Sequence, residues 1–200
     1  MVRSTEDRLR KRLRKVGTAR TRELEQAGIT RTQIARLVSA GKLQRIGRGL
    51  YAPEDYQETE HSALVAVAKR APNAVFCLLT ALRFHEITTQ SPFEVWIAIA
   101  NKDHPPRLEY PSLRTMRFSE ASLRYGVQVR KVEGVALRIT SPAKTVADCF
   151  KFRNKVGLDV ALDALREVLR ERKATADDLW RCAEVNRVAN VMRPYLEATA

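Results

Sequence analysis

The chain has few of the residues that build disulfide scaffolds or metal sites. Its 200 residues include only three cysteines and three histidines. Cys77, Cys149 and Cys182 are odd in number and far apart, they form no Cys-x-x-Cys pair, and no histidine lies at metal-ligand spacing from them. We therefore expect three free, buried thiols, with no disulfide framework, no metal site and no cofactor.

Long apolar segments are also missing. The N-terminal sequence MVRSTEDRLRKRLRKVG is charged throughout and has no apolar signal-peptide core, and no stretch approaches the roughly 20 apolar residues of a membrane span. The sequence thus predicts a cytoplasmic, reduced protein that does not associate with a membrane. Hydrophobic residues still make up 44% of the chain, which is enough to give one medium domain or two small ones a core.

Positive charge is concentrated at the N-terminus. Residues 1–53 hold 14 Lys/Arg and 4 Asp/Glu, a net charge of +10, whereas the other 147 residues hold 22 and 19, a net charge of +3. The polar, acidic segment 53–58 separates the two parts, so we place the domain boundary there, with domains at 1–53 and 54–200. This asymmetry favours a basic module that faces nucleic acid, although a solvated basic surface would have the same composition.

A basic helix is expected at the start of the first domain. Leu9, Leu13 and Val16 recur at helical spacing and should face inward. Basic residues cover the other faces, and among them Arg12 and Lys15 are candidates for contacts with DNA phosphates.

Two short helices joined by a tight turn are expected next. Thr21 is predicted to cap a helix at Arg22–Ala27, which Gly28 ends in a left-handed conformation. Thr30 caps the following helix, and Gly41 closes it. Followed by a basic hairpin, this order of elements predicts a winged helix-turn-helix, which places its last helix against the major groove of DNA.

The outer face of that last helix supplies the candidates for reading bases. Ile34, Leu37 and Val38 fall on one face, which leaves a polar set on or near the opposite face. The base-reading candidates are Arg31, Thr32, Gln33 and Arg36. Arg and Gln carry the forked donors and acceptors that match guanine and adenine edges.

A short hairpin should form the wing. Its strands are predicted at Leu43–Ile46 and Leu50–Tyr51, joined by Gly47-Arg48-Gly49, whose glycines permit positive φ. The candidates for contacting the DNA backbone here are Lys42, Arg45 and Arg48. A solubilising hairpin tip is the alternative interpretation.

The remaining residues predict a mixed domain, so the expected fold class is α+β. At least four strands are expected, at Glu94–Ile99, Arg114–Phe118, Val127–Val132 and Val135–Ile139. Helices are expected at Thr59–Arg70, through Cys77–Ile87, after the Ser141-Pro142 cap, from Leu158 to Arg170, and after a capping box at Thr175. His85 should be a hydrogen-bonded core or edge residue rather than a ligand.

Three charged residues of the C-terminal part, Lys144, Asp148 and Arg153, are interpreted as surface residues. Lys144 and Asp148 are four residues apart and can pair on a helix surface, a contact worth only about 0.3 to 0.5 kcal/mol. A structural role is one interpretation, and a functional surface, such as one that contacts nucleic acid, is the other.

An enzyme is the main competing class. A metal-dependent nuclease would need carboxylates and a lysine that converge at strand ends, and the nearest set is Glu94, Lys102, Asp103 and Glu109. No Asp and Glu-x-Lys pair lies on consecutive strands, and no Gly-Ser turn precedes an Asp-x-Asp motif as a nucleotidyltransferase would require. Asp159 and Asp163, one helical turn apart, are expected to face solvent. We therefore do not expect an enzyme.

The order of three segments resembles a known family. TRELEQAGITRTQIARLVSAGKLQRIGRGLYA, CLLTALRFHEITTQSPFEVWIAI and ITSPAKTVADCFKFRNKVGLDVALDALRE together resemble the AbiEi-type antitoxins, bacterial transcriptional regulators associated with abortive phage infection. The resemblance spans nearly the whole chain, and the two later segments are its more discriminating part.

The resemblance implies the antitoxin of a type IV toxin–antitoxin system. Its N-terminal domain would bind inverted repeats in its own promoter and repress it, and its C-terminal domain would counter a nucleotidyltransferase-like toxin without a stable complex. Under this interpretation Lys144, Asp148 and Arg153 would form a surface used in antitoxicity. The family offers no catalytic motif, so only the DNA-binding role is transferred, to Arg31, Thr32, Gln33, Arg36, Arg45 and Arg48. Similar chains also occur as solitary regulators, and both a monomer and a dimer remain compatible with the sequence.

Overall fold

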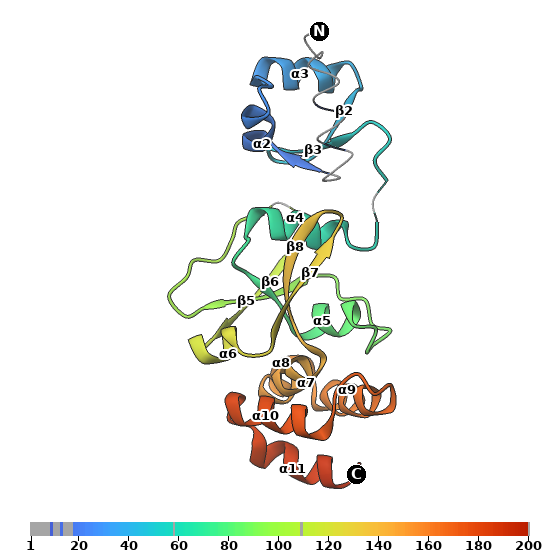
Figure 1. Cartoon of the computed structure of the whole chain (residues 1–200), viewed down its shortest axis with the longest axis vertical. Helices are drawn as coiled ribbons and strands as arrows, with labels where there is room; N and C mark the ends of the chain where they lie inside the picture. Colours follow the sequence, from blue (N-terminus) through green and yellow to red (C-terminus); the bar gives the residue numbers. More distant parts are fainter. Residues whose placement is uncertain (1–8, 10–12, 14–17, 58, 109, 200) are drawn as a thin grey trace. The chain divides into compact units, whose positions relative to one another are not determined.

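The computed structural model describes residues 9, 13, 18–57, 59–108 and 110–199. The protein is a mixed α+β chain with one three-stranded and one five-stranded sheet, as the fold class predicted (Figure 1). The described chain divides into two compact units. The first contains the residues up to Ala71 together with short segments at 107–111 and 131–136, and the second contains the rest. The N-terminal unit therefore includes a helix beyond the sequence-predicted boundary at residue 53.

The first unit is built from short elements. They are β1 (Ala19–Arg20), α2 (Thr21–Gln26), α3 (Arg31–Ser39), β2 (Leu43–Gly47), β3 (Leu50–Pro53) and α4 (Ser62–Arg70). The sheet order is β1-β3-β2 with antiparallel neighbours. The two hairpin strands were predicted. Strand β1 was not, because two residues are too few to show alternation.

The ends of the two short helices depend on capping. Thr30 caps α3 as predicted: its side chain accepts from the Gln33 amide at 3.3 Å, and the Gln33 side chain accepts from the Thr30 amide at 2.9 Å. Gly28 follows α2 with the positive φ that was predicted, and Gly41 follows α3, whose end it was predicted to mark, also with positive φ. The predicted Thr21 cap is wrong by one residue. Arg20 is the N-cap, its amide donating to Glu23 at 2.7 Å, and Thr21 begins α2.

A small apolar core supports these helices. Its buried members are Leu9, Leu13, Ala19, Leu24, Ile29, Ile34, Leu37 and Leu43. Leu9 and Leu13 were predicted to face inward, and each is at most 3% exposed. Val16 lies outside the described residues. Because Ile34 and Leu37 face this core, the opposite side of α3 is left to solvent.

The second unit places a mixed sheet beside a group of helices. The strands are β4 (Val75–Phe76), β5 (Val95–Ala100), β6 (Leu113–Phe118), β7 (Val127–Val132) and β8 (Val135–Thr140), in the order β6-β5-β4-β8-β7. Strand β4, which lies at the centre of this sheet and has only two residues, was not predicted from the sequence. It pairs antiparallel to β5 and parallel to β8, while β5 and β6 are parallel.

The helices of this unit follow mostly as expected. They are α5 (Leu78–Phe84), α6 (Glu120–Arg124), α7 (Pro142–Lys151), α8 (Arg153–Val156), α9 (Leu158–Arg170), α10 (Ala176–Asn186) and α11 (Ala189–Glu197). Ser141 caps α7 and Thr175 caps α10, as predicted. Helices α6 and α11 were not predicted. Helix α11 contains Pro194, a residue usually read as a helix breaker.

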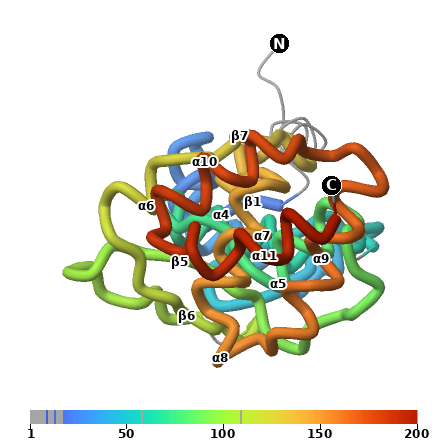
Figure 2. Tube along the Cα trace, turned by 90° about the horizontal axis from the view of Figure 1, so that it is seen from below, coloured from blue at the N-terminus to red at the C-terminus, as the bar shows by residue number. Residues whose placement is uncertain are grey.

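One continuous core joins sheet and helices in the second unit. It includes Trp96 and Ala98 of β5, and α7 contributes Val146, Ala147 and Phe150. Figure 2 shows α10 and α11 lying across α7, which has eight consecutive buried residues, 143–150. All three cysteines are free and buried, as predicted. Within the described chain, none of the helices is long and apolar enough to cross a bilayer.

The partly buried His85 should make the stability of this unit depend on pH. It is hydrogen-bonded, as predicted: its Nε2 donates to the Thr140 carbonyl at 2.7 Å. Burial lowers the pKa of His85 below its ordinary value, and the Thr140 hydrogen bond opposes this. Because the folded state disfavours the protonated ring, this contribution to stability is complete above about pH 6.5 and is lost as pH falls toward the folded pKa.

We expect the melting temperature to fall between pH 7.5 and pH 5.5, and His85→Gln to reduce that fall. The Gln amide nitrogen reaches about as far as His Nε2, so it can still donate to Thr140, but it does not titrate. Thermal unfolding followed by circular dichroism at several pH values measures how the melting temperature of each protein depends on pH. The same fall in melting temperature for wild type and variant would show that His85 does not cause the pH dependence.

Candidate nucleic-acid interface

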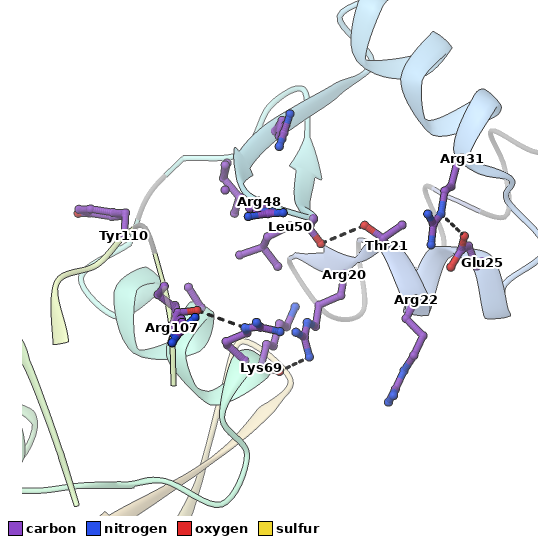
Figure 3. Close-up of a pocket in the computed structure, with 17 residues that line it drawn as sticks. Arg20, Thr21, Arg22, Glu25, Arg31, Arg48, Leu50, Lys69, Arg107 and Tyr110 are labelled. Atoms are coloured by element: carbon purple, nitrogen blue, oxygen red, sulfur yellow. Dashed lines mark hydrogen bonds and ion pairs between the residues drawn. The ribbon is translucent and has the colours of Figure 1, made fainter. Parts of the chain in front are cut away.

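A basic groove of about 1190 Å³ lies within the first unit (Figure 3). Its lining comes from β1 and α2, the start of α3, the β2–β3 hairpin, α4, and the residues Arg107, Leu108 and Tyr110. The charged residues that line it are Arg20, Arg22, Glu25, Arg31, Arg45, Arg48, Lys69, Arg70 and Arg107. These are eight cations and one carboxylate, so the described lining favours a polyanion.

The hairpin tip is held against the start of α2. The Thr21 amide donates to the Gly49 carbonyl at 2.9 Å, and the Thr21 hydroxyl donates to the same oxygen at 3.4 Å. Gly49 has φ +69°, and an added Cβ would lie 3.1 Å from the Thr21 hydroxyl oxygen, so this position favours glycine. These contacts fix Arg48, the residue before Gly49, at the rim of the groove.

The side of the groove formed by α4 is also fixed by hydrogen bonds. The Arg20 guanidinium donates to the Lys69 carbonyl at 2.9 Å, and the Lys69 ammonium donates to the Thr18 hydroxyl at 2.6 Å. Arg70 Nε donates to the Arg107 carbonyl at 3.4 Å. The last turn of α4 is thereby joined to β1 on one side and to the 107–111 segment on the other.

The groove is continuous with the start of α3. A smaller hollow of about 320 Å³ shares Thr21, Arg31 and Gly49 with it and adds Ile34 and Tyr51. Arg31 pairs with Glu25 at 2.7 Å, although its side chain remains 80% exposed. The one carboxylate of the described lining thus already pairs with a cation.

The structure distributes the sequence-predicted residues over two adjacent surfaces. Arg31, Arg45 and Arg48 line the groove. Thr32 and Arg36 are exposed on α3 outside the lining, and Lys42 is exposed beyond the C-terminal end of α3. Gln33 is only half exposed, because its side chain closes the capping box. Arg12 and Lys15 lie outside the described residues.

Five basic residues of the groove were not predicted. They are Arg20, Arg22, Lys69, Arg70 and Arg107. Lys69 and Arg70 carried a local signal, since both lie in the last turn of α4, where cations are favoured by the helix dipole. Arg107 follows two adjacent prolines, and no local pattern relates it to the hairpin.

The predicted surface pair Lys144 and Asp148 is wrong in its placement. Both side chains are 0% exposed. The Lys144 ammonium pairs with Asp148 Oδ1, donates to the Ser122 hydroxyl at 3.2 Å and lies 4.9 Å from the Phe118 ring centroid. The reason for the error is that α10 and α11 cover α7, so residues on its otherwise polar face become core residues.

A closed polar network surrounds this buried pair. Asn186 of α10 donates to Asp148 Oδ1 at 2.7 Å and accepts from the Ser122 hydroxyl at 2.8 Å. Asp148 Oδ2 has no hydrogen-bond partner among the described residues. Burial raises the pKa of Asp148 above its ordinary value, while the Lys144 ammonium and the Asn186 amide oppose this. Arg153 is only partly exposed, its guanidinium donating to the Phe150 carbonyl at 2.9 Å.

The residues weighed for a nuclease make other contacts. Glu94 pairs with Arg114 at 3.6 Å, and the backbone carbonyl of Asp103 accepts from the Arg117 guanidinium at 3.1 Å. Asp163 pairs with Arg166 at 3.2 Å. Glu109 lies outside the described residues. Among the residues that are described, no three of His, Cys, Asp and Glu are grouped so that they could hold a metal ion.

Comparison with known proteins supports a regulatory role. Residues 7–53 match the model of a family described as "Transcriptional regulator, AbiEi antitoxin". This match confirms the resemblance to the AbiEi antitoxin family over the N-terminal segment, and that family is regulatory. No curated protein sequence matches the chain. The crystal structure of the RV2827C protein from Mycobacterium tuberculosis is similar in fold, with a TM-score of 0.62 over 100% of this chain and 83% of that one at 12% identity.

Proposed function

We propose that this protein is a DNA-binding transcriptional repressor whose N-terminal unit is a winged helix-turn-helix. In this assignment α2 and α3 are the two helices of the motif, and the β2–β3 hairpin is the wing. The observation that carries the proposal is the groove of eight cations and one carboxylate, formed in the unit whose sequence matches a regulator family. Operator DNA, with one negative charge per phosphate, is the partner that this charge distribution fits.

Helix α3 would supply the sequence-specific contacts. Its exposed Arg31 and Arg36 can donate two hydrogen bonds to a guanine edge, and Thr32 can donate or accept one. Gln33 offers its amide nitrogen, because its oxygen is held in the capping box. Arg45 and Arg48 would contact phosphates or enter the minor groove beside the wing. Inverted repeats would bind two copies, one on each half-site.

The wider proposal is that the repressor is the antitoxin of a type IV system in the cytoplasm. It would repress its own promoter and, through the C-terminal part, counter a nucleotidyltransferase-like toxin without forming a stable complex. What supports this is the AbiEi antitoxin match of residues 7–53. A solitary regulator is the second candidate, because the regulator match covers residues 7–53, which lie in the proposed DNA-binding unit.

Repression is tested with a reporter driven by the DNA upstream of this gene. The wild-type protein should lower reporter expression, and Arg45→Ala/Arg48→Ala should restore much of it, because neither guanidinium has another partner among the described residues. Arg166→Ala, an exposed arginine of α9 outside the groove, is the matched control and should still repress. Equal reporter expression with and without the wild-type protein would contradict the proposal.

The antitoxin part is tested separately from the repressor part. If the neighbouring gene encodes a nucleotidyltransferase-like protein, its expression should arrest growth, and co-expression of this chain from an unrelated promoter should restore growth. The Arg45→Ala/Arg48→Ala variant should restore growth as well, since repression is not needed in that arrangement. Growth arrest that this chain leaves unchanged would favour the solitary regulator.

A further inference from the structure

We infer that the end of α4 and the described residues Arg107 and Tyr110 form a second DNA-backbone contact site, facing the same groove as the hairpin. This inference rests on the proposed function, since it assigns further contacts to the same DNA. It extends the DNA-binding surface beyond the helix-turn-helix and the family match at residues 7–53. The residues assigned to phosphate contact are Arg70 and Arg107, with Tyr110 at the rim.

Arg70 and Arg107 are placed as a pair. Arg70 Nε donates to the Arg107 carbonyl at 3.4 Å, which leaves the two terminal nitrogens of the Arg70 guanidinium without a described partner. Both side chains are exposed and line the groove. The Arg107 guanidinium makes no hydrogen bond or ion pair with another residue that the structure describes. Both can therefore donate to phosphate oxygens without breaking an existing ion pair.

Lys69 acts as a positioning residue for the side of the groove that α4 forms. Its carbonyl accepts from the Arg20 guanidinium and its ammonium donates to Thr18, so it joins the end of α4 to β1. Thr18 is buried, at 1% exposure, so the hydrogen bond from Lys69 ends inside the first unit. Because Lys69 holds the end of α4 in place, replacing it could weaken DNA binding either by removing a contact or by displacing the helix. Arg70 and Arg107 are therefore the residues to test.

The chemistry of the groove favours a nucleic-acid backbone over a single small anion. Its cations come from five separate segments and line a groove of about 1190 Å³, and its described lining has one carboxylate, which Arg31 already pairs with. One phosphate would need only a few of these cations, whereas a strand of DNA offers a series of phosphates. Tyr110, 65% exposed at the rim, adds an uncharged hydroxyl of a kind often found on phosphates.

The test measures how binding depends on salt in the full-length protein. Affinity for a DNA fragment from upstream of the gene is measured between 50 and 200 mM salt by fluorescence anisotropy, and the slope of log K against log[salt] is compared. Each phosphate contact adds about 0.9 to this slope. We expect Arg70→Ala and Arg107→Ala each to make it shallower by about 0.9, and the double variant by about 1.8.

Two further variants separate charge from structure. Arg70→Lys/Arg107→Lys keeps both charges and should retain most of the wild-type slope, while Arg166→Ala removes an arginine outside the groove and should leave it unchanged. If wild type binds with a steep slope and Arg70→Ala/Arg107→Ala binds with the same slope, this inference is overturned and the proposed function survives. If wild type binds no upstream fragment, the proposed function fails and this inference fails with it.

Discussion

Replacing Lys144 by Met should destabilise the protein by about 3–5 kcal/mol at neutral pH. The Lys144 ammonium is the cation paired with Asp148, and both side chains are completely buried. Met fills a similar volume but carries no charge, so Asp148 would be left as a buried carboxylate with one hydrogen bond, from Asn186. Urea denaturation followed by circular dichroism measures the loss directly.

The loss should depend on pH in a defined direction. Burial already raises the pKa of Asp148, and removing the opposing Lys144 charge raises it further. A folded state that holds a proton more tightly than the unfolded state loses stability as pH rises through the interval between the two pKa values. Lys144→Met should therefore be least destabilising near pH 5 and most destabilising above neutrality.

Two comparisons decide whether the buried charge is the cause. Lys144→Met/Asp148→Asn leaves no charge in the network and should be more stable at neutral pH than Lys144→Met alone. Lys155→Met, at an exposed lysine beyond α7, should change stability by less than about 0.5 kcal/mol. A Lys144→Met protein as stable as wild type would show that the pair is not buried as described.

Replacing Arg36 by Ala should cost about 1–3 kcal/mol of binding energy on operators that keep one particular base pair. Arg36 is exposed on α3 and lies outside the groove lining, so its role is assigned to a base edge rather than to phosphates. On operators altered at that base pair the same replacement should cost little. Arg48→Ala should instead weaken binding to every operator variant by a similar factor.

Gln33 needs a different substitution, because Ala would also remove the capping box of α3. Gln33→Glu retains an oxygen that can accept from the Thr30 amide, but it loses the amide donor and adds a negative charge. Stability should be kept, and the added charge should weaken binding to every operator, with a further loss on operators that keep one particular base pair. Binding to a panel of single-base operator variants measures both this further loss and the Arg36 effect. For either variant, a loss of the same size over the whole panel would contradict its base-reading assignment.

Local patterns predicted those parts of the fold that local physics determines. The Thr30 cap, the positive φ of Gly28, the helix end at Gly41 and the Ser141 cap all depend on residues within a few positions of each other. The short strands β1 and β4 have only two residues each and exist because other strands pair with them. No sequence window of that length carries enough alternation to reveal them.

The candidate site was predictable only in the part that lies on one helix and one hairpin. Arg31, Arg45 and Arg48 were found because their charges lie within the helix-turn-helix pattern. Arg70 and Arg107 lie 37 residues apart and meet only through the fold. The burial of Lys144 has the same origin, since its neighbour Asn186 comes from α10, far along the chain.

The most direct test is the affinity of the purified protein for the DNA upstream of its own gene, measured against a scrambled fragment of equal length at one physiological salt concentration. A repressor that reads bases through α3 should bind its own fragment at least about 10³-fold more tightly than the scrambled one. Equal affinity for the two fragments would reduce the groove to a non-specific basic surface and contradict the account.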